Sequence, residues 1–562
     1  MILNITGIRL SLDDTEDALL TTVANLLAIP QNSVSSLKVL RRSVDARRNR
    51  PPFIVYAIEA VVPDDIDLAK AGDKATVSVV SESKASSFVD KNPPLPLYNK
   101  VGVGEFSDKQ ASVSPHSPFS HMQKNRKVVV VGSGPAGIFA ALTLAEKGIP
   151  VLLLERGKKV SERCLDVHDF WEAGKLDGES NVLFGEGGAG TFSDGKLTSR
   201  SKNLKVQFVK ETLVELGAQS DILIDAKPHI GTDRLREVLV NFRKKLISLG
   251  CDIKFGARVD DFLIQSDRIA GLVVNGKEMA TECLILAIGQ NADDTYTRLH
   301  ERGIRLAPKP FAMGLRVEHP QELINEMQYG KWRQHPALPP ADYFLTAKTA
   351  HPSRSVYTFC MCPGGRIIGC SSSPGTIITN GMSGSRRDGL HANSAVVVNV
   401  TIDDFSGTIE EPLKGLEFRR HWEEKAFASG GHNYYAPAQR LLDFLQDREN
   451  GKPISTSFLP GVKAASLRET LPPFVTEALK YGLRQFGTKM PGFASEDAVL
   501  VGVETRTSSP VRILRDTSGQ SVNTAGLYPC GEGAGYAGGI ISSALDGIRA
   551  AENIIISLGC SR

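Results

Sequence analysis

The sequence lacks any long uncharged apolar run. No stretch offers the roughly 18 apolar residues that a membrane-spanning helix needs, and the opening MILNITGIRLSLDD has no basic segment before an apolar core. The eight cysteines are scattered, without the paired spacing of a zinc site or of a small disulfide framework. These absences argue against a membrane-spanning or secreted protein. We therefore expect a soluble cytoplasmic chain with reduced cysteines and no bound metal.

An excess of charge of one sign is also missing. The 66 Lys and Arg residues nearly balance the 63 Asp and Glu residues, which leaves a net charge of +3 over 562 residues. Such a small charge gives no strong field, so composition argues neither for nor against a nucleic-acid partner. The length exceeds what one hydrophobic core normally organises, and two or three domains are expected.

The first 90 residues have the pattern of a small α/β module. ILNITGIRLSL and FIVYAIEAVV alternate like strands, and TEDALLTTVANLLAI has helical spacing. Between them, LRRSVDARRNRPP is expected to be a loop that either contacts phosphate or forms an exposed basic turn. Its arginines are Arg41, Arg42, Arg47, Arg48 and Arg50. Serine, proline, lysine and glycine then dominate a predicted linker at 91–126.

A strand, a glycine turn and a helix follow the linker. KVVVV, from Lys127, predicts a short buried strand, and IFAALTLAEK predicts a helix after the turn GSGPAG. In this G-x-G-x-x-G motif, Gly132 permits the tight turn, Gly134 lets backbone approach a pyrophosphate, and Gly137 lets helix and strand pack closely. The next strand, VLLL, ends at Glu155, which is placed to accept hydrogen bonds from ribose hydroxyls. The motif predicts an adenine dinucleotide without a 2′-phosphate, either FAD or NAD.

Two later segments favour FAD. TECLILAIGQNA predicts a buried strand ending near Gly289, and GLYPCGEGAGYAGGIISSALDGIRAAE predicts a strand, a glycine turn and a helix. A domain that binds only NAD needs neither segment. Together with the first motif, they resemble the two-dinucleotide-fold flavoproteins, in which the chain returns at its C-terminus to complete the FAD site. There an acidic residue, usually Asp but here Glu532, binds the flavin ribityl chain.

A closer resemblance rests on longer motifs. NVLFGEGGAGTFSDGKLTSR, KPHIGTDRLREVL, VYTFCMCPGG, GVETRTSSPVRILRD and LYPCGEGAGYAGGI resemble those of an uncharacterised family of FAD-dependent dehydrogenases of bacteria and plastids, within the two-dinucleotide-fold flavoproteins. The resemblance covers about residues 127–552 and implies the fold and FAD, without a substrate. It also implies that the glycine-rich stretch after the Glu155-Arg156-Gly157 turn lies along the cofactor.

The predicted cofactor-binding residues combine these segments. They are Gly132, Ser133, Gly134, Pro135, Ala136, Gly137, Glu155, Arg156, Gly185, Glu186, Gly187, Gly188, Ala189, Gly190, Val259, Ala287, Gly289, Gly531, Glu532, Gly538, Gly539 and Ile540. The helix near Gly538 is expected to point its positive end at the flavin, which favours the negative charge of the reduced form.

The candidate catalytic residues are Lys196, Arg506, Cys360, Cys362 and His229. Lys196 either stands near the reactive flavin face or pairs on the surface with Asp194. Arg506 could clamp a carboxylate or enolate, or simply pair with Glu504.

The other three candidates have competing interpretations as well. Cys360 and Cys362 share one face of a predicted strand, and they could be a redox pair, ligands of a soft metal, buried packing residues or part of the substrate cavity. His229 either donates a proton or supports a helix start at Thr232 or Asp233. On a flat strand the two cysteines would be too far apart for an unstrained disulfide, so we expect reduced thiols.

The predicted fold class is α/β. A Rossmann-like FAD-binding domain at 127–300 is completed by a C-terminal part at 496–562, with an inserted α+β substrate or cap domain at 301–495 and the small α/β module at 1–90. Apart from GAGYAG at 533–538, which belongs to the C-terminal segment assigned to the FAD site, no second G-x-G-x-x-G follows a strand after Gly289. We therefore expect NAD(P)H, if it is the reductant, to visit the substrate cavity transiently.

The expected function is an FAD-dependent oxidoreductase, a dehydrogenase or reductase that transfers a hydride between flavin and a small organic molecule. The alternative is a flavin-dependent RNA-modifying or RNA-binding protein that uses the basic N-terminal module, although a nucleic-acid partner is the less favoured expectation. A flavin-binding scaffold without catalysis is a third possibility.

Overall fold

The structure is a computed structural model. It describes residues 1–47, 50–68, 75–80, 127–199, 201, 203–350, 353–449 and 454–559. The chain forms two compact units, Met1–Asp45 with Pro52–His121, and Ala46–Pro51 with Met122–Arg562. The predicted linker at 91–126 lies outside the described residues. None of the helices in the described part of the chain is long and apolar enough to cross a membrane.

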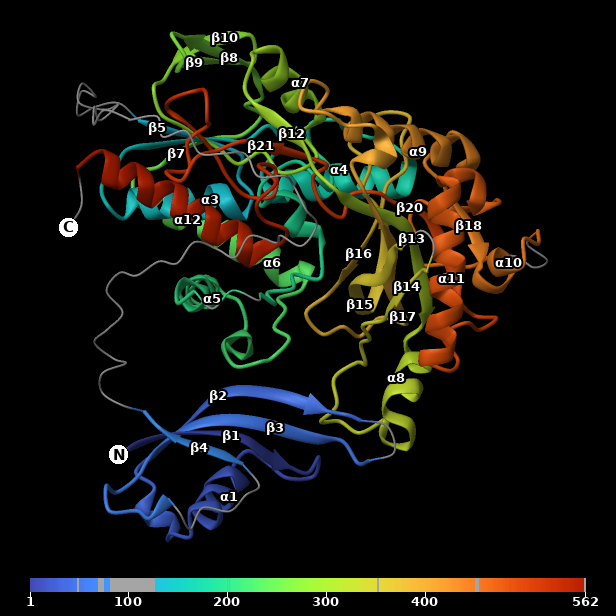
Figure 1. Ribbon diagram of the computed structural model, residues 1–562. Helices are drawn as coiled ribbons and strands as arrows, with labels where there is room; N and C mark the ends of the chain where they lie inside the picture. The colour runs from blue at the N-terminus through green and yellow to red at the C-terminus, as the bar shows by residue number, and fades with distance from the viewer. Residues whose placement is uncertain are drawn as a thin grey trace. The chain divides into compact units, whose positions relative to one another are not determined.

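In its described residues, the first unit is an antiparallel sheet with one α-helix (Figure 1). Its strands, in the order β2-β3-β1-β4, and its helix are β2 (Ser36–Asp45), β3 (Phe53–Val61), β1 (Ile2–Leu10), β4 (Thr76–Val79) and α1 (Ala18–Leu27). Alternate apolar side chains of β1 and β3, such as Leu3 and Ile58, meet Val23 of α1 in a buried core. The expectation of a loop at Arg41 and Arg42 is wrong, because β2 runs through both positions, paired with β3.

The second unit contains a five-stranded parallel sheet. Its order is β22 (Leu527–Pro529), β11 (Leu284–Leu286), β5 (Val128–Val131), β6 (Val151–Leu154) and β7 (Asp252–Lys254). The strands β5 and β6 are buried along their whole length, as their uninterrupted apolar sequences require when both faces of a parallel sheet are covered. Since β22 pairs with β11, the chain returns from its C-terminal region to complete this sheet.

Two helices from opposite ends of this unit pack together on the parallel sheet. They are α3 (Pro135–Ala145) and α12 (Ile540–Ser557), which lie side by side (Figure 1). Proline at the first position of α3 suits the start of a helix, because its missing N–H has no partner there in any case. A cluster of apolar side chains fills the space between the sheet and the smaller β-sheets nearby.

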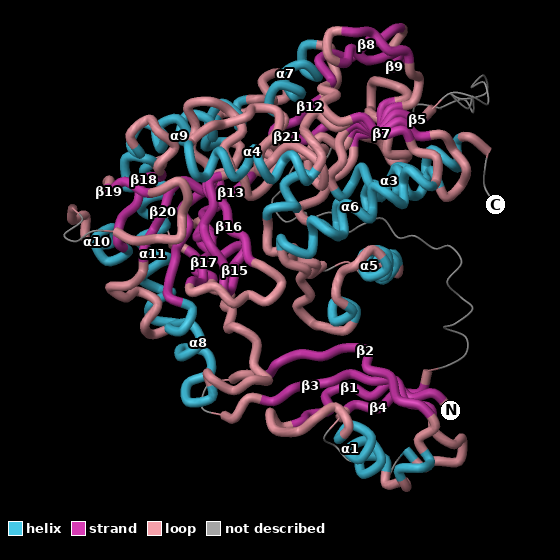
Figure 2. Tube along the Cα trace, turned by 180° about the vertical axis from the view of Figure 1, so that it is seen from behind, coloured by secondary structure: helices cyan, strands magenta, loops and turns pink. Residues whose placement is uncertain are grey.

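A second, mostly antiparallel sheet adjoins the first. Its main path is β14 (Thr346–Lys348), β15 (Ser355–Gly369), β17 (His391–Val400), β13 (Phe311–Pro320), β20 (Val499–Glu504), β18 (Ala436–Arg440) and β19 (Val462–Ala464), and β16 (Thr379–Ser383) pairs with β15. The helix α11 (Pro473–Lys489) packs along β13, β14, β15 and β17 (Figure 2). Together they enclose a large apolar core.

The remaining elements connect these layers. The strands are β8 (Val259–Gln265), β9 (Arg268–Val274), β10 (Lys277–Ala280), β12 (Leu306–Pro308) and β21 (Val511–Ile513). The helices are α4 (Val160–Ala173), α5 (Lys205–Glu215), α6 (Thr232–Ser248), α7 (Asp293–Glu301), α8 (Gln321–Tyr329), α9 (Lys414–Gly430) and α10 (Leu441–Leu445), and a 3-10 turn, η3, covers Gly188–Phe192. The predicted α/β fold class, with a parallel Rossmann-like sheet, is confirmed.

Candidate active site

A pocket of about 540 Å³ opens where the parallel strands end. The turn after β5, the end of β6, the turns after β11 and β22, the start of α12 and the glycine-rich stretch around η3 all line it. Residues of β15, β16 and β20 line it as well. In open α/β sheets the ligand site lies outside the carboxyl ends of the strands, so this pocket has the position of a nucleotide site.

The three glycines of the first turn have different surroundings. Gly132 has a φ of +99°, and a Cβ there would lie 2.4 Å from the Ala287 oxygen. A Cβ on Gly137 would lie 1.8 Å from the Gly132 oxygen. Gly134 is extended, and its Cβ would meet only the Cα of Gly188, 4.0 Å away. The fold itself requires Gly132 and Gly137, whereas Gly134 leaves free space facing the pocket.

The start of α12 has the same property. Gly538 and Gly539 precede its first residue, Ile540, and a Cβ on either glycine would meet nothing within 4 Å. Both glycines line the pocket. The unpaired N–H groups of a helix start attract anions, and the open space at these glycines lets a ligand approach the backbone.

Glu155 organises the turn from beneath. One carboxylate oxygen accepts hydrogen bonds from the backbone N–H and the hydroxyl of Ser133, at 2.9 and 2.7 Å. The other accepts from the backbone N–H groups of Gly157 and Gly185, at 2.9 and 3.1 Å. Glu155 is buried and lines the pocket. It therefore joins the first glycine turn to the glycine-rich stretch, a role that its position after a strand does not reveal.

A second buried residue, Arg163 of α4, holds the glycine-rich stretch in place. It donates from Nε to the Asn181 oxygen at 2.7 Å, and from its terminal nitrogens to the oxygens of Glu186 and Gly188 at 2.7 and 3.0 Å. Its side chain is inaccessible to solvent. Sequence reasoning missed this residue, because nothing local marks an arginine of a helix as the partner of backbone oxygens about 25 residues away.

Arg156 is fixed at the edge of the pocket. It pairs with Glu179, at 2.8 Å, and with Asp294, at 3.0 Å, and its guanidinium lies 4.1 Å from the centre of the Phe184 ring. Although burial opposes it, the hydrogen bonds that Arg156 donates to these carboxylates raise its pKa further above the ordinary value. The side chain therefore stays charged and oriented.

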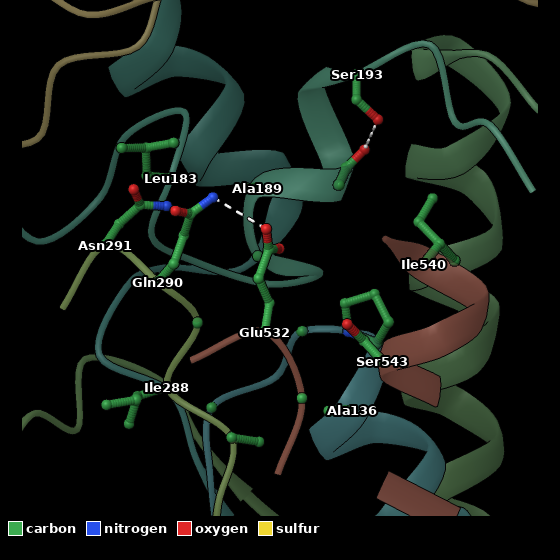
Figure 3. A pocket seen from close by; sticks show the side chains of 18 of the residues that line it. Ala136, Leu183, Ala189, Ser193, Ile288, Gln290, Asn291, Glu532, Ile540 and Ser543 are labelled. Carbon is green, nitrogen blue, oxygen red and sulfur yellow. Dashed lines mark hydrogen bonds between the residues drawn. The ribbon is translucent and has the colours of Figure 1, made fainter. Parts of the chain in front are cut away.

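Glu532 points into the pocket after β22. Figure 3 shows it facing Gln290, whose side-chain amide donates to Glu532 Oε1 at 2.9 Å, with Ile540 and Ser543 of α12 on the opposite side. Burial raises the pKa of Glu532 to about 7, against a smaller opposing effect of Lys309. The carboxyl group is thus able to change its protonation near neutral pH.

Lys196 is held by a buried acidic residue. Its Nζ lies 2.5 Å from Asp194, which also accepts from Arg387 at 2.6 and 3.0 Å and from the Ser383 hydroxyl. Burial alone would raise the pKa of Asp194, but Lys196 and Arg387 hold it below the ordinary value. The pair Lys196 and Asp194 is therefore an anchored part of the pocket wall and not a surface pair.

The two cysteines meet at Lys196. Its Nζ lies 4.0 Å from Cys360 Sγ and 3.7 Å from Cys362 Sγ. The assumption of a flat strand is wrong, because the pairing of β15 with β17 shifts register between Phe359 and Cys362, and Cys360 has a φ of +47°. The extra residue is a β-bulge, which bends the strand. Among the described residues, the seven cysteines are free thiols.

Arg506 has a different partner from the predicted one. Its guanidinium binds Glu423 at 2.9 and 3.0 Å and approaches Asp293 at 3.4 Å. Glu504, the expected partner, instead pairs with the buried Arg316, at 3.0 Å. The expectation of an Arg506–Glu504 pair is wrong because β20 ends at Glu504, whose carboxylate is already bound by Arg316, while Glu423 of α9 is the carboxylate that reaches Arg506.

His229 lies beside the lysine and outside the pocket lining. Its backbone pairs with that of Lys196, and its Nε2 lies 3.1 Å from the Ser385 oxygen. Burial and the nearby Arg387 lower its pKa. The helix after it, α6, begins at Thr232, whose hydroxyl donates to the Thr191 oxygen at 2.8 Å.

The structure brings most of the predicted site together. All predicted cofactor-binding residues except Gly137, Glu186 and Gly187 line the pocket. Lys196, Cys360 and Arg506 line it too, whereas Cys362 and His229 lie directly behind that wall.

Sequence reasoning missed several polar residues of the pocket. Gln290 and Asn291 directly follow the end of a parallel strand, and that position is a signal that could have identified them. Thr379 and Asn380 of β16 belong to no motif, and no sequence signal marks them.

Comparison with known proteins gives a consistent picture. Residues 310–507 match the family model "FAD-dependent protein, C-terminal domain-like", and residues 126–212 match "Pyridine nucleotide-disulphide oxidoreductase". Residues 1–61 match a domain of unknown function.

Three similar proteins differ widely in how much of the chain they cover. An uncharacterized protein of Clostridium beijerinckii is 42% identical over 557 residues, which is 99% of both chains. The FAD-dependent monooxygenase nodY1 of Hypoxylon pulicicidum is 27% identical over 29% of this chain and 37% of its own. The crystal structure of CtdE in complex with FAD is 13% identical, covers 77% of this chain and 84% of its own, and gives a TM-score of 0.31.

The chain belongs to the same family as the Clostridium protein, a family of FAD-dependent oxidoreductases. It is an FAD-dependent enzyme. The residues present suit this cofactor, because Gly134, Gly538 and Gly539 leave room for a ligand against backbone N–H groups, at two helix starts that face one pocket.

Proposed function

We propose that this enzyme transfers a hydride between bound FAD and a small organic substrate held beside Lys196. The observation that carries the proposal is the pocket itself, which runs from the glycine turn after β5 to a wall that contains Lys196, Cys360 and Asn380. The glycine turn and the start of α12 supply the dinucleotide end. The polar wall is the remaining surface on which a substrate can bind.

The cofactor would be held by backbone and by three acidic or amide side chains. Gly134 offers an N–H group and open space for the pyrophosphate, Gly538 and Gly539 leave open space for the flavin at the start of α12, and Glu155 fixes the turn at the ribose end. Glu532 and Gln290 present a hydrogen-bonded carboxyl and amide to the ribityl side. When bound, FAD supplies the hydride acceptor or donor.

The chain's own contribution to chemistry centres on Lys196. Its ammonium is fixed by Asp194 and lines the pocket, so it can bind and orient a carboxylate or carbonyl oxygen. A cation placed before the reaction stabilises negative charge that develops on such an oxygen. Its pKa is raised by the neighbouring sulfurs and by Asp194, although burial opposes this, and the lysine therefore stays protonated at neutral pH.

The reductant is proposed to share this pocket. After Gly289 the sequence has one further G-x-G-x-x-G, GAGYAG at 533–538, and it precedes α12 at the same pocket. Since no separate glycine turn remains for a second dinucleotide, we propose that a nicotinamide cofactor, if used, enters only transiently. Reduction by the substrate itself is the other source of electrons in this proposal.

An anaerobic titration tests the proposal. NADH, NADPH and candidate organic acids and carbonyl compounds are added to the purified flavoprotein while the oxidised flavin absorbance is followed. We expect rapid bleaching with at least one of them. The Lys196→Met variant should keep its FAD but react roughly a hundredfold more slowly, the usual effect of removing one transition-state contact.

The matched control is Lys205→Met. Lys205 pairs with Glu552 outside the pocket, so this variant should react at the wild-type rate. If Lys196→Met reacts within about a factor of two of the wild type, the lysine is structural only. Bleaching by NAD(P)H followed by oxygen incorporation into an added compound would replace the proposal with a monooxygenase activity, as in the name of the Hypoxylon relative.

A further inference from the structure

The pocket contains a dithiol with two unequal members. Cys360 lines the pocket, and Cys362 is completely buried behind it. The Cys362 thiol donates to the backbone oxygen of Cys360 at 3.3 Å, and both sulfurs lie within 4.0 Å of Lys196 Nζ. The bulge in β15 leaves Cys360 at a positive φ of 47°, in the region that costs a non-glycine residue conformational energy.

The charges around the pair favour a thiolate. The Lys196 ammonium lies within 4.0 Å of both sulfurs, and the charge of the buried Arg316 also acts on Cys360. The acidic groups that face the pair, Asp194 and Glu504, are each already bound by an arginine. The hydrogen bond from Cys362, followed by the charges of Lys196 and Arg316, lowers the pKa of the Cys360 thiol well below its ordinary value despite burial.

Two simpler interpretations fit less well. A metal cation is disfavoured because the Lys196 ammonium touches both sulfurs, and no group of three metal-ligating side chains occurs in the part of the chain that the structure describes. Inert packing describes Cys370 better. That cysteine also lines the pocket, but its thiol lies 3.4 Å from the Ile378 oxygen, and burial raises its pKa to well above the ordinary value.

We propose that Cys360 and Cys362 are a reactive dithiol that reduces small disulfides entering the pocket, with Cys360 as the nucleophile and Cys362 as the resolving thiol. The segment 126–212, which matches the pyridine nucleotide-disulphide oxidoreductase model, contains one cysteine, Cys164, and that residue is not part of the proposed dithiol. The proposal does not depend on which organic molecule reacts with the flavin.

The reaction is a pair of exchange steps. The Cys360 thiolate attacks one sulfur of a disulfide RSSR, the Cys360–SR bond forms, the RS–SR bond breaks, and RS⁻ leaves. Cys362 then loses its proton and attacks the Cys360 sulfur, which forms the Cys360–Cys362 disulfide and expels the second RS⁻. The two cysteines lose two electrons, RSSR gains them, and the proton of Cys362 passes to a leaving thiolate.

Lys196 is a positioning residue in this scheme. Its ammonium stabilises the Cys360 thiolate and is itself held by Asp194. Removing its charge should therefore slow the reaction of Cys360 with any electrophile at neutral pH. Raising the pH should restore the rate in that variant, because the Cys360 thiol then ionises without the lysine.

The test uses oxidised glutathione as the probe on the full-length flavoprotein. After acid quenching and alkylation, trypsin should release Ser355–Arg366, which contains both cysteines, because Arg354 precedes it and Arg366 ends it. In the wild type we expect this peptide to carry no alkyl group and to be two hydrogen atoms lighter than the same peptide with two free thiols. Two molecules of reduced glutathione should be released per chain. The Cys362→Ser variant should instead carry one glutathione on Cys360.

Two further variants make the test independent of folding. The Cys370→Ser variant should react with oxidised glutathione as the wild type does, because the Cys370 thiol donates to the Ile378 oxygen and is not part of the proposed dithiol. In the Lys196→Met variant, iodoacetamide should alkylate Cys360 at least tenfold more slowly than in the wild type at pH 7. At high pH the two proteins should be alkylated at the same rate. The proposal is overturned if Ser355–Arg366 remains reduced and free of glutathione in both the wild type and Cys362→Ser. It is equally overturned if the Lys196→Met rate matches the wild type at pH 7.

Discussion

At the scale of single residues, Gly134 separates a requirement of the ligand from one of the fold. Its backbone is extended and a Cβ would meet no protein atom closer than 4.0 Å, so the fold tolerates a side chain there. Gly134→Val should therefore fold but lose FAD, because the branched side chain occupies the space of the pyrophosphate. The measurement is the molar ratio of heat-released FAD to chain, beside the far-ultraviolet circular dichroism.

The matched comparison is Gly137→Val. A Cβ at that position would lie 1.8 Å from the Gly132 oxygen, so this variant should fail to fold as well as lose FAD. A yellow Gly134→Val protein with one FAD per chain would show that the cofactor does not pass this turn.

Arg506 leads to a prediction about stability. The guanidinium is 6% exposed and its main partner, Glu423, is completely buried. Arg506→Met should lower the free energy of unfolding by about 3–5 kcal/mol, since it leaves a buried carboxylate without its partner. Urea denaturation of both proteins measures this.

The control is Arg420→Met, which removes an exposed pair with Glu424 on the same helix, α9. It should change the free energy of unfolding by no more than about 1 kcal/mol. Equal changes in the free energy of unfolding for the two substitutions would mean that the buried pair stabilises the fold no more than an exposed pair does.

Glu532 gives a pH dependence with a definite sign. Its folded-state pKa is raised to about 7, above the unfolded value of 4.5, so the folded protein holds a proton that the unfolded chain loses. The stability contributed by this group is complete at low pH and is lost as the pH rises from about 4.5 through 7. In the FAD-free protein, Glu532→Gln should remove this part of the slope between pH 5 and 7.

Thermal unfolding of wild type and variant across that range, at constant ionic strength, makes the comparison. A steeper loss of stability toward low pH in the wild type than in Glu532→Gln would contradict the assignment, because it would require a lowered pKa at Glu532.

The same scale shows what sequence can and cannot predict. The G-x-G-x-x-G motif and Glu155 were identifiable because turn, spacing and strand all lie within one local segment. Arg163 and Arg387 could not be found, since their partners are distant backbone oxygens and a carboxylate 193 residues away. The partner of Arg506 was misassigned for the same reason, as Glu423 lies 83 residues earlier.

At the scale of elements, the return of the chain is essential to the site. Among the described strands, β22 pairs with β11 alone, at the edge of the parallel sheet, and α12 packs on α3. A chain that ends at residue 525 loses both elements and exposes their apolar partners. It should be insoluble or FAD-free although the first glycine turn is intact, whereas a chain that ends at Leu558 should bind FAD normally.

Expression of the two truncated chains and measurement of their flavin content make this test. A soluble, yellow protein ending at residue 525 would show that the N-terminal strand, turn and helix suffice for FAD.

Element prediction succeeded where periodicity was strong. Uninterrupted valines and leucines defined β5 and β6, and the bounds of the second matched the expectation, Val151–Leu154. It failed at β2, where charged residues at Arg41 and Arg42 hid a strand whose partner decides its conformation. The bulge in β15 was equally hidden, because it results from register with β17 and not from local sequence.

At the scale of the whole molecule, the pocket belongs to one compact unit. Every lining residue lies between Val131 and Ser543, and the first unit is built from Met1–Asp45 and Pro52–His121. A chain that starts at Met122 should therefore retain one FAD and an unchanged flavin spectrum. Loss of FAD from that chain, with the fold preserved, would assign the N-terminal unit a part in cofactor binding.

The central claim is that this pocket holds FAD for redox chemistry, and the flavin content of the full-length wild-type protein tests it most directly. The FAD that heat releases is measured as a molar ratio to the purified protein. Any colourless fraction is then incubated with FAD, and the ratio is measured again. The structure predicts a yellow protein with about one non-covalent FAD per chain, because two helix starts and two open glycine sites face a single pocket. A folded but colourless protein that takes up no FAD on reconstitution would contradict the account.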